Sequence, residues 1–521
     1  MCGIIAVFCK NHTYIHEIIN SYEKLSNRGP DSGTLSIKNN VFLGFRRLSI
    51  NDMSESGNQP IISCLNGKTI SLMCNGEIYN HMDLEKEFGI VCKSSSDCEI
   101  ILKLYEKIGF SETIKRLDGD FAVVITDGDM VYLARDRVGV RPLFTGVTRD
   151  GGFAVASVAK ALLSFCDNVK QLEPSIVSYN KKTLVFTLEK YIYPIFIITE
   201  NDKYSIIEKT LVNAVRKRLM SERPVGCLLS GGLDSSLVAS ILCKLIGPLN
   251  VRTYSIGMRG SSDLKYAQIV AKYLGTQHTE VLFTPEEGLA SIPKVIEALE
   301  SYDITTVRAS VGMYLLAEYI KNNTDDIVIL SGEGSDELLC GYLYFHNTPS
   351  SDKASEESLR LINDLYKYDV LRADRTISVH GLELRVPFLD KDFLHLAMSL
   401  TGDQKKPLYG FEKYILRTAF KNGYLPDEIL WRRKCAFSDG ISPDTKSWYE
   451  IIQEYVDTKI NEKIWDNNKN NFPSKESFWY KQIFDEYFPT FLNPIDYYWM
   501  PKWTNATDPS ARDFWKNKEE I

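Results

Sequence analysis

Strand-sized apolar runs alternate with helix-sized runs in the middle of this chain, and this alternation constrains the fold more than any other feature. From Val225 the order is VGCLL, SLVASILCKLIG, VRTYSI, DLKYAQIVAKYLG and HTEVLF, with a loop after each strand-like run. Strands that alternate with helices predict a parallel, doubly wound α/β sheet. Ligands of such sheets bind beyond the carboxyl ends of the strands. The loops after VGCLL, VRTYSI and DIVIL are therefore the expected binding loops.

The residues before about 190 follow a different pattern. Short strand-like runs (GIIAVF, VFLGFRRLSI, TISLMC, FAVVIT, MVYLAR and GFAVAS) are separated by Gly, Asn and Asp turns, and a helix is expected around Glu99 to Ile108. This pattern indicates a strand-rich α+β domain. The chain has 521 residues, and single cores stop growing at roughly 250 to 300 residues. We therefore expect two domains, at 2–190 and 204–521.

Charge, cysteine usage and run lengths exclude several classes of protein. The net charge of −7 is spread along the chain without a basic block, which argues against nucleic acid as a partner. No Cys/His zinc spacing occurs, and no apolar run reaches the roughly 18 residues that a membrane helix needs. The amino-terminal run is too short for a signal peptide. The absence of a basic block makes small molecules the better expectation for the substrates. Eleven scattered cysteines without a CxxC pair indicate reduced thiols and a cytoplasmic protein.

A glycine-rich loop, LLSGGLDSS, occupies Leu228 to Ser236 between an expected strand and an expected helix. Such a turn presents backbone N–H groups and a helix amino terminus to phosphate. It lacks the lysine of GxxxxGK[ST] loops, and a plain turn with Asp234 as helix cap is the alternative. SGGxDS resembles the pyrophosphate-binding loop of the ATP pyrophosphatases, which release AMP and pyrophosphate.

A second loop, DIVILSGEGSDELLCGY, is acidic and again joins a strand to a helix. Mg²⁺ on nucleotide phosphates takes one or two carboxylates, so Asp336 is expected to join Asp234 as a metal ligand. Glu333 and Glu337 are either further site residues or solvated turn residues, and the choice for Glu337 stays open. Ile256, the last residue of VRTYSI, is expected to contact the adenine.

Cys2 is a candidate nucleophile. If Met1 is removed, Cys2 gains a free α-amine whose pKa is about 7.7 to 8.0, close enough to neutrality to serve as its own base. An amino-terminal nucleophile then needs no histidine partner. For an isolated Cys2, a small buried cysteine that opens a strand would be the better interpretation.

Polar turns elsewhere in the first half support the catalytic interpretation. RGPD, RRLSI, CNGEIYN and SSSDCE each place polar groups beside apolar strands. An arginine can bind a carboxylate with two bonds, Asp97 can hold an ammonium group, and Asn75 with the Gly76 N–H can stabilise an oxyanion. Together these groups suit glutamine as the substrate.

The motifs resemble those of the glutamine-hydrolysing asparagine synthetases over essentially the whole length. The first half matches class II glutamine amidotransferases through Cys2, RGPD, RRLSIND, NGEIYN, SDCE and LDGDFA, and the second half matches through SGGLDSS, SIG, YDITTVRAS, SGEGSDE, GLELRVPFLD and WRRKCAFSDG. The resemblance implies an amino-terminal-nucleophile glutaminase of four-layer αββα type at 2–190, fused to an adenylating α/β domain at 204–521.

The resemblance also implies a role for each matching residue. Cys2 is the nucleophile, and the groups that bind glutamine or its oxyanion are Arg47, Asn75, Gly76, Glu77 and Asp97. The ATP-binding residues are Leu229, Ser230, Gly231, Gly232, Asp234, Ser235, Ile256, Ser331 and Gly332. Asp234 and Asp336 hold Mg²⁺, and Lys434 contacts phosphate as a catalytic residue. Glu333 and residues 305–308 are candidates for binding aspartate, and bacterial relatives suggest a homodimer.

The implied activity is that of a carbon–nitrogen ligase. It would hydrolyse glutamine, activate aspartate as β-aspartyl-AMP, and form asparagine, glutamate, AMP and pyrophosphate. A β-lactam synthetase on the same scaffold is the nearest alternative, but such enzymes lack the Cys2 nucleophile. A sensor that binds glutamine or nucleotide without turnover is the non-enzymatic alternative, and the retention of Cys2, Asp234, Asp336 and Lys434 argues against it.

Overall fold

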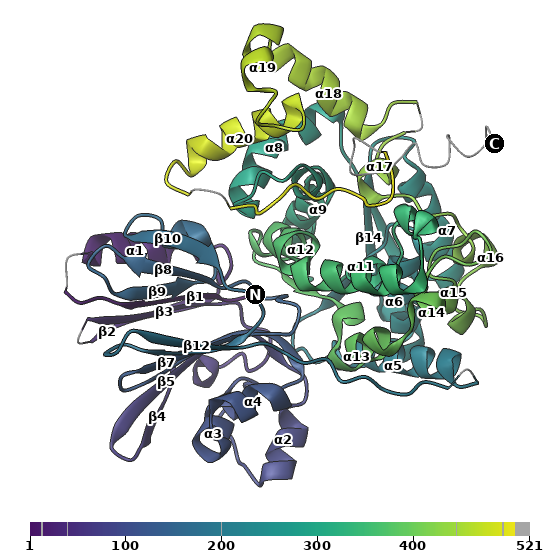
Figure 1. The fold of residues 1–521 in the computed structure, drawn as a ribbon. Coiled ribbons are helices and arrows are strands. Elements are labelled where there is room, and N and C mark those ends of the chain that lie inside the picture. Colours follow the sequence, from purple (N-terminus) through teal and green to yellow (C-terminus); the bar gives the residue numbers. More distant parts are fainter. Residues whose placement is uncertain (12–13, 39, 200, 444, 492–493, 506–521) are drawn as a thin grey trace. The chain divides into compact units, whose positions relative to one another are not determined.

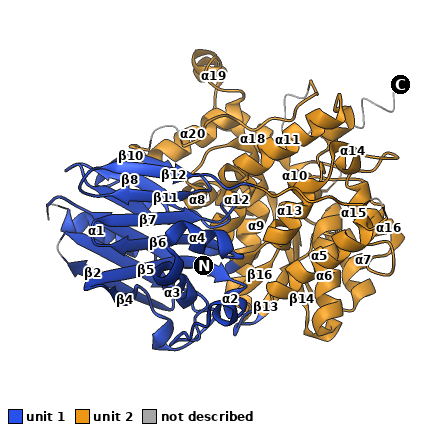
Figure 2. Ribbon diagram, turned by 60° about the horizontal axis from the view of Figure 1, so that its bottom comes forward, with its two compact units in different colours: residues 1–192, 220–224, 378–383 blue, residues 193–219, 225–377, 384–521 orange. Residues whose placement is uncertain are grey.

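The computed structural model describes residues 1–505 except 12–13, 39, 200, 444 and 492–493. The chain forms two compact units, which Figure 2 colours separately. Unit 1 consists of residues 1–192, 220–224 and 378–383, and unit 2 consists of 193–219, 225–377 and the residues from 384 onward. None of the helices formed by the described residues has the length and apolar character needed to cross a membrane.

Two six-stranded sheets form the centre of unit 1. The first has the order β10-β8-β9-β1-β3-β2 and the second β12-β11-β7-β6-β5-β4. The strands are β1 (Gly3–Phe8), β2 (Ser32–Lys38), β3 (Val41–Arg47), β4 (Ile61–Leu65), β5 (Lys68–Ile78), β6 (Gly119–Asp127), β7 (Met130–Arg135), β8 (Phe144–Thr148), β9 (Phe153–Ala156), β10 (Cys166–Gln171), β11 (Ile176–Asn180) and β12 (Val185–Glu189). The pairs β1·β3 and β5·β6 are antiparallel, so the polar ends of distant motifs lie on neighbouring strands.

Helices cover the outer face of each sheet in unit 1. Ile4, Phe45, Val124 and Leu133 belong to one core that lies between the two sheets. A second core joins β5 and β6 to the helices α2 (His81–Phe88), α3 (Glu99–Ile108) and α4 (Phe110–Arg116), while α1 (Ile15–Glu23) contacts β3. The resulting order of layers is helix, sheet, sheet, helix (Figure 1). The expected αββα fold is confirmed.

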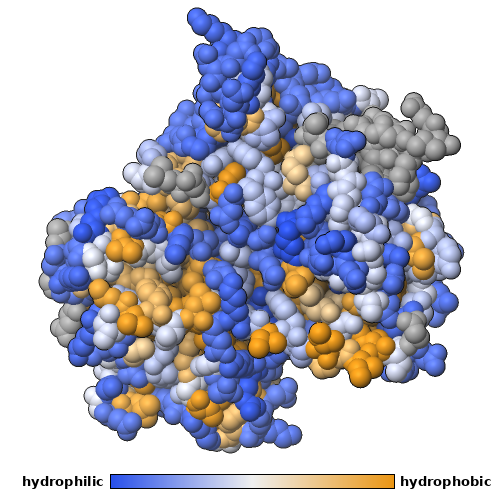
Figure 3. All heavy atoms as spheres, in the orientation of Figure 1, coloured by the Kyte–Doolittle hydropathy of each residue, from blue (hydrophilic) through white to orange (hydrophobic). Residues whose placement is uncertain are grey.

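β12 forms an edge of the second sheet and is exposed along its whole length. Val185, Phe186 and Leu188 are about half exposed, at 55%, 50% and 48%. Figure 3 shows apolar atoms gathered over the sheets of unit 1 on the face that it presents. β1, in contrast, is buried at every position, which explains its uninterrupted apolar sequence GIIAVF.

Unit 2 is built on a five-stranded sheet with the order β15-β14-β13-β16-β17. Its strands are β13 (Val225–Leu228), β14 (Arg252–Gly257), β15 (Gln277–Leu282), β16 (Val328–Leu330) and β17 (Glu383–Arg385). The pairs β13·β14, β13·β16 and β14·β15 are parallel, as the alternation of strands and helices predicts. The loops after β13, β14 and β16 consequently lie together at the carboxyl edge of the sheet.

Helices surround this sheet and form the remainder of unit 2. They are α5 (Lys203–Lys217), α6 (Leu233–Ile246), α7 (Ser262–Leu274), α8 (Pro285–Leu299), α9 (Ile304–Asn323), α10 (Ser335–Leu338), α11 (Ser351–Asp364), α12 (Asp369–Ser378), α13 (Lys391–Ser399), α14 (Gly402–Lys405), α15 (Tyr414–Ala419), α16 (Asp427–Leu430), α17 (Phe437–Gly440), α18 (Trp448–Lys459), α19 (Glu462–Asn468) and α20 (Lys475–Tyr487). α6 begins directly after the glycines of SGGLDSS, so its amino terminus points at the loop.

Candidate active sites

Cys2 lies in unit 1 immediately before β1, and hydrogen bonds fix its backbone on both sides. Its N–H donates to Oδ1 of Asn75 on β5 over 2.8 Å, and its carbonyl accepts from Nε of Arg28 over 3.0 Å. The thiol points to the carbonyl oxygen of Leu48, 3.6 Å away. These contacts bring the CNGEIYN, RGPD and RRLSI motifs around the thiol.

Asn75 is fully buried beside Cys2, and its Nδ2 group has no hydrogen-bond partner among the residues that the structure describes. A buried N–H donor without a partner costs free energy, and a bound ligand that accepts from Nδ2 would remove this cost. At Gly76 an added Cβ would meet the Asp120 carbonyl oxygen at 2.1 Å, so only glycine fits. The site therefore presents an open amide donor next to a thiol.

Burial controls the protonation of Cys2 while Met1 is attached. Desolvation raises the pKa of the Cys2 thiol to about 11. The Met1 ammonium is also buried, and desolvation lowers its pKa even though a carboxylate oxygen of Glu383 lies 3.7 Å away. The thiol therefore stays protonated near neutral pH in the chain that carries Met1.

Arg47 ends β3 and is buried, with both terminal nitrogens engaged by the loop at 51–58. Nη1 donates to the Ser54 carbonyl over 2.7 Å and to Oδ1 of Asn58 over 3.1 Å. Nη2 donates to the carbonyls of Asn51, over 3.3 Å, and of Asp52. In this structure Arg47 therefore holds the loop that borders the site.

The two predicted acidic residues of unit 1 are also buried and bonded. Glu77 follows Gly76 on β5 and accepts a hydrogen bond from Nδ2 of Asn51. Asp97 precedes α3 and accepts from the Ile78 N–H over 2.6 Å. Burial raises the pKa of the Asp97 carboxyl. Glu77 and Asp97 therefore both lie at the end of β5 that carries Asn75 and Gly76.

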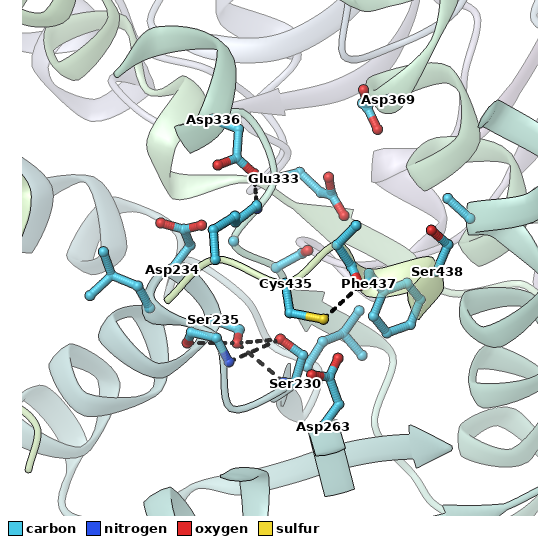
Figure 4. A pocket seen from close by; sticks show the side chains of 18 of the residues that line it. Ser230, Asp234, Ser235, Asp263, Glu333, Asp336, Asp369, Cys435, Phe437 and Ser438 are labelled. Carbon is cyan, nitrogen blue, oxygen red and sulfur yellow. Dashed lines mark hydrogen bonds and ion pairs between the residues drawn. The ribbon is translucent and has the colours of Figure 1, made fainter. Parts of the chain in front are cut away.

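A pocket in unit 2 opens at the carboxyl edge of its sheet (Figure 4). All of the residues predicted to bind ATP line it except Gly231, and Asp336 and Lys434 line it as well. Gly231 has φ of +71° and approaches the chain at residues 266–267, where an added Cβ would meet the Ala267 nitrogen at 2.4 Å. Only glycine therefore allows the loop to pack this closely against residues 266–267.

Two lysines hold the predicted metal-binding carboxylates. Nζ of Lys413 lies 2.5 Å from Oδ2 of Asp234 and 2.7 Å from Oδ1 of Asp336, and Nζ of Lys434 lies 2.5 Å from Oδ2 of Asp336. Burial disfavours the charged form of Asp336, but the two lysines outweigh it and hold the pKa of that carboxyl below its usual range. Lys413 is a site residue that the sequence motifs did not reveal, because FEKYIL has no distinctive pattern.

The donor set at Asp234 and Asp336 fits Mg²⁺ bound together with a nucleotide. Both carboxylates reach the same lysine nitrogen, so they converge on one point. The described residues contain no cluster of three or more Asp, Glu, His or Cys side chains arranged for a metal. Mg²⁺ is commonly held by one or two carboxylates and substrate phosphates, with waters filling the other positions. Two converging carboxylates meet this requirement.

A second set of charged groups lines the same pocket around Arg372 of α12. Its Nε lies 2.9 Å from Oδ1 of Asp369 and its Nη2 lies 2.8 Å from Oε2 of Glu333. Arg372 is only 6% exposed, and its Nη1 has no hydrogen-bond partner in the described part of the chain. This corner of the pocket therefore contains a buried guanidinium nitrogen without a described partner, beside two carboxylates.

Of the other candidates for binding aspartate, Arg308 and Thr305 both line the pocket. The guanidinium of Arg308 is buried against Glu476, with Nη2 2.7 Å from Oε2, so it supports the helices around the pocket. Thr305 has a buried hydroxyl without a partner among the described residues. Asp369 and Arg372 were missed in the sequence because they lie outside the matched motifs.

Comparisons with known proteins match both halves of the chain. A family model described as a glutamine amidotransferase domain matches residues 1–205, and one described as asparagine synthase matches 207–356 and 346–506. The chain is 44% identical to a mouse protein named as a glutamine-hydrolysing asparagine synthetase, over 98% of both chains. It is 43% identical to the human and chicken proteins of that name, over the full length of each.

Proposed function

Because the chain belongs to the glutamine-hydrolysing asparagine synthetases, which make asparagine from aspartate with ATP and glutamine, we propose a division of labour among its residues. Cys2 and its neighbours in unit 1 release ammonia from glutamine. The pocket of unit 2 activates aspartate with ATP. One observation carries this proposal. The Asn75 side chain accepts from the Cys2 N–H through Oδ1, and its buried Nδ2 has no described partner.

The glutaminase step follows from the groups around Cys2. After removal of Met1, the freed α-amine takes the thiol proton, and the thiolate attacks the side-chain amide carbon of glutamine. Nδ2 of Asn75 and the Gly76 N–H stabilise the oxyanion of the tetrahedral intermediate. As this intermediate collapses, the α-ammonium group of Cys2 returns its proton to the leaving nitrogen, which departs as ammonia and leaves a thioester. Water then hydrolyses the thioester to glutamate and the free thiol. Asp97 and Glu77 supply negative charge for the glutamine ammonium group, and Arg47 fixes the border of the pocket.

The synthetase step uses the pocket of unit 2. The loops around Ser230 and Gly232, and around Ser331 and Gly332, bind the phosphates of ATP. The aspartate side-chain carboxylate attacks the α-phosphorus, which yields β-aspartyl-AMP and pyrophosphate, and ammonia then displaces AMP. Lys434 and Lys413 offset negative charge that develops on the pyrophosphate. Mg²⁺, when held by Asp234 and Asp336, would further neutralise the phosphate oxygens.

We place the acceptor aspartate in the corner formed by Arg372, Asp369 and Glu333. The open Nη1 of Arg372 would bind the α-carboxylate, and the neighbouring carboxylates would bind the α-ammonium group. Arg372→Ala should raise KM for aspartate by about a hundredfold, because a buried charged hydrogen bond is lost. KM for glutamine in the glutaminase assay should not change.

Steady-state kinetics of the purified variant with varied aspartate measures this effect. The matched control is Arg360→Ala, since Arg360 pairs with Glu357 and Asp364 and does not line the pocket. An unchanged KM for aspartate in Arg372→Ala, or an equal rise in Arg360→Ala, would remove Arg372 from the substrate site.

We also propose that the protein works in the cytoplasm as a homodimer. All eleven cysteines lie among the described residues and are free thiols, which supports a reducing compartment. The exposed apolar edge strand β12 supports self-association. Sedimentation analysis should give the mass of two chains, and the mass of one chain would contradict the dimer.

A further inference from the structure

The short segment 220–224 belongs to unit 1, although the chain on both sides of it belongs to unit 2. It lies between α5, which ends at Lys217, and β13, which begins at Val225 and leads into the SGGLDSS loop. A division of the sequence into two consecutive domains does not anticipate this placement. The contacts of Glu222 and Arg223 explain it.

Glu222 and Arg223, which we call the brace, bind the stretch 49–52 that follows β3. The Glu222 N–H donates to the Ile50 carbonyl over 3.0 Å, and Oε1 of Glu222 accepts from the Asp52 N–H over 2.9 Å. Nε of Arg223 donates to the Ser49 carbonyl over 2.9 Å. The brace thus satisfies backbone groups at three of the four positions in this stretch.

A second bond of Arg223 extends the brace to the RGPD motif. Its Nη2 donates to Oδ2 of Asp31 over 2.9 Å, and the same oxygen accepts from the Ser49 N–H over 2.8 Å. Asp31 therefore ties Arg223 and Ser49 together. Ser49 is thus held by two hydrogen bonds: its carbonyl accepts from Arg223, and its N–H donates to Asp31.

The residues around Ser49 contact Cys2 and Arg47. The Leu48 carbonyl is the oxygen to which the Cys2 thiol points, at 3.6 Å. Arg47 donates to the carbonyls of Asn51 and Asp52, the second of which is held by Glu222 through its N–H. A shift of 49–52 would therefore displace both the Leu48 carbonyl and the loop that Arg47 holds.

The carboxylate of Asp52 connects the brace to the segment before α3. Its Oδ2 accepts from the Ser95 N–H over 3.0 Å, and Ser95 lies two residues before Asp97. The same stretch therefore contacts the segment that ends in the predicted ammonium-binding residue. Hydrogen bonds therefore connect Glu222 through Asp52 to Arg47 and to Ser95.

We propose that Glu222 and Arg223 are positioning residues of the glutaminase reaction. They belong to the short segment before β13, and this segment is part of unit 1. They touch no reacting atom and act through Leu48, Arg47 and Asp52. This inference rests on the proposed roles of Cys2 and Arg47. Its signature is weaker binding of glutamine with little change in the chemical step, because Asn75 and Arg28, which lie outside this stretch, still hold the backbone of Cys2.

The test uses the full-length protein and four variants, Glu222→Ala, Glu222→Gln, Arg223→Ala and the double alanine variant. KM for glutamine should rise about fivefold in Glu222→Ala and more than about tenfold in the double variant, while kcat changes less than about twofold. Glu222→Gln should behave like the parent, because its amide oxygen still accepts from the Asp52 N–H. Ammonia-dependent asparagine synthesis should be the same in all of them.

The control is Glu87→Ala, which removes an exposed carboxylate of unit 1 that pairs with Arg116 at 2.7 Å, away from this stretch. An unchanged KM for glutamine in the double variant would overturn the proposal. So would equal damage in Glu222→Gln and Glu222→Ala, or an equal fall in ammonia-dependent synthesis, since these results indicate general destabilisation. Loss of glutaminase activity in Cys2→Ala tests the underlying assignment separately.

Discussion

Replacing Cys2 with alanine is expected to abolish glutamine-dependent asparagine synthesis while leaving synthesis from ammonium salts intact. Alanine is small enough to permit removal of Met1, so the variant keeps its free amine and loses only the thiol. Glutamine hydrolysis should fall by at least about a thousandfold, because the covalent step has no other nucleophile. Measuring glutamate release and asparagine formation with each nitrogen source on the same preparation separates the two activities.

Cys9→Ala is the matched control for this experiment. Cys9 directly follows β1, the strand that begins after Cys2, and like Cys2 it is a half-buried residue with a free thiol. It should retain both activities. Glutaminase activity that survives in Cys2→Ala would show that another group is the nucleophile, and loss of ammonia-dependent synthesis would show that the substitution acts beyond unit 1.

Asp234→Asn is expected to have the second largest effect, on the synthetase reaction alone. The asparagine can still accept from the Ser335 hydroxyl, which now donates to Oδ1 of Asp234 over 2.8 Å. It removes the negative charge that pairs with Lys413 and that would bind Mg²⁺. Pyrophosphate release should fall by at least about a hundredfold, and the glutaminase rate should be unchanged.

A coupled pyrophosphate assay at several Mg²⁺ concentrations measures this result. The control is Asp466→Asn, because Asp466 is an exposed residue of α19 that pairs only locally with Lys469 in the described structure. Parent-like pyrophosphate release at low Mg²⁺ in Asp234→Asn would exclude Asp234 as a metal ligand. A parallel loss of glutamine hydrolysis would indicate that the substitution disturbs more than the pocket.

Local sequence pattern predicted the elements that short-range physics determines. The apolar periodicity of EIILKLYEKI predicted the helix at Glu99 to Ile108, and α3 has these bounds. The runs that became β1, β6 and β13 were equally clear, because buried strands need continuous apolar sequence. β12 was not predicted. Its run VFTLE contains three apolar residues that are exposed, so the sequence does not reveal that this strand lies at an edge of the sheet.

Long-range contacts set the parts of the sites that sequence could not supply. Lys413 reaches Asp234 across 179 positions of the chain, and Glu222 reaches Asp52 across 170. Neither pairing leaves a local pattern, because tertiary folding alone brings the partners together. For Arg47 the sequence indicated a site residue but not its contacts. Its motif predicted a role at the site, and the structure shows that its terminal nitrogens donate to the loop at 51–58.

The central claim is that one chain transfers nitrogen from glutamine to aspartate with ATP. It is tested most directly by incubating the purified protein with glutamine labelled by heavy nitrogen in its side-chain amide, together with aspartate and MgATP. Mass spectrometry then follows the label and identifies the nucleotide product. We predict labelled asparagine together with AMP and pyrophosphate. Glutamate and pyrophosphate without labelled asparagine, or no turnover at all, would contradict the account.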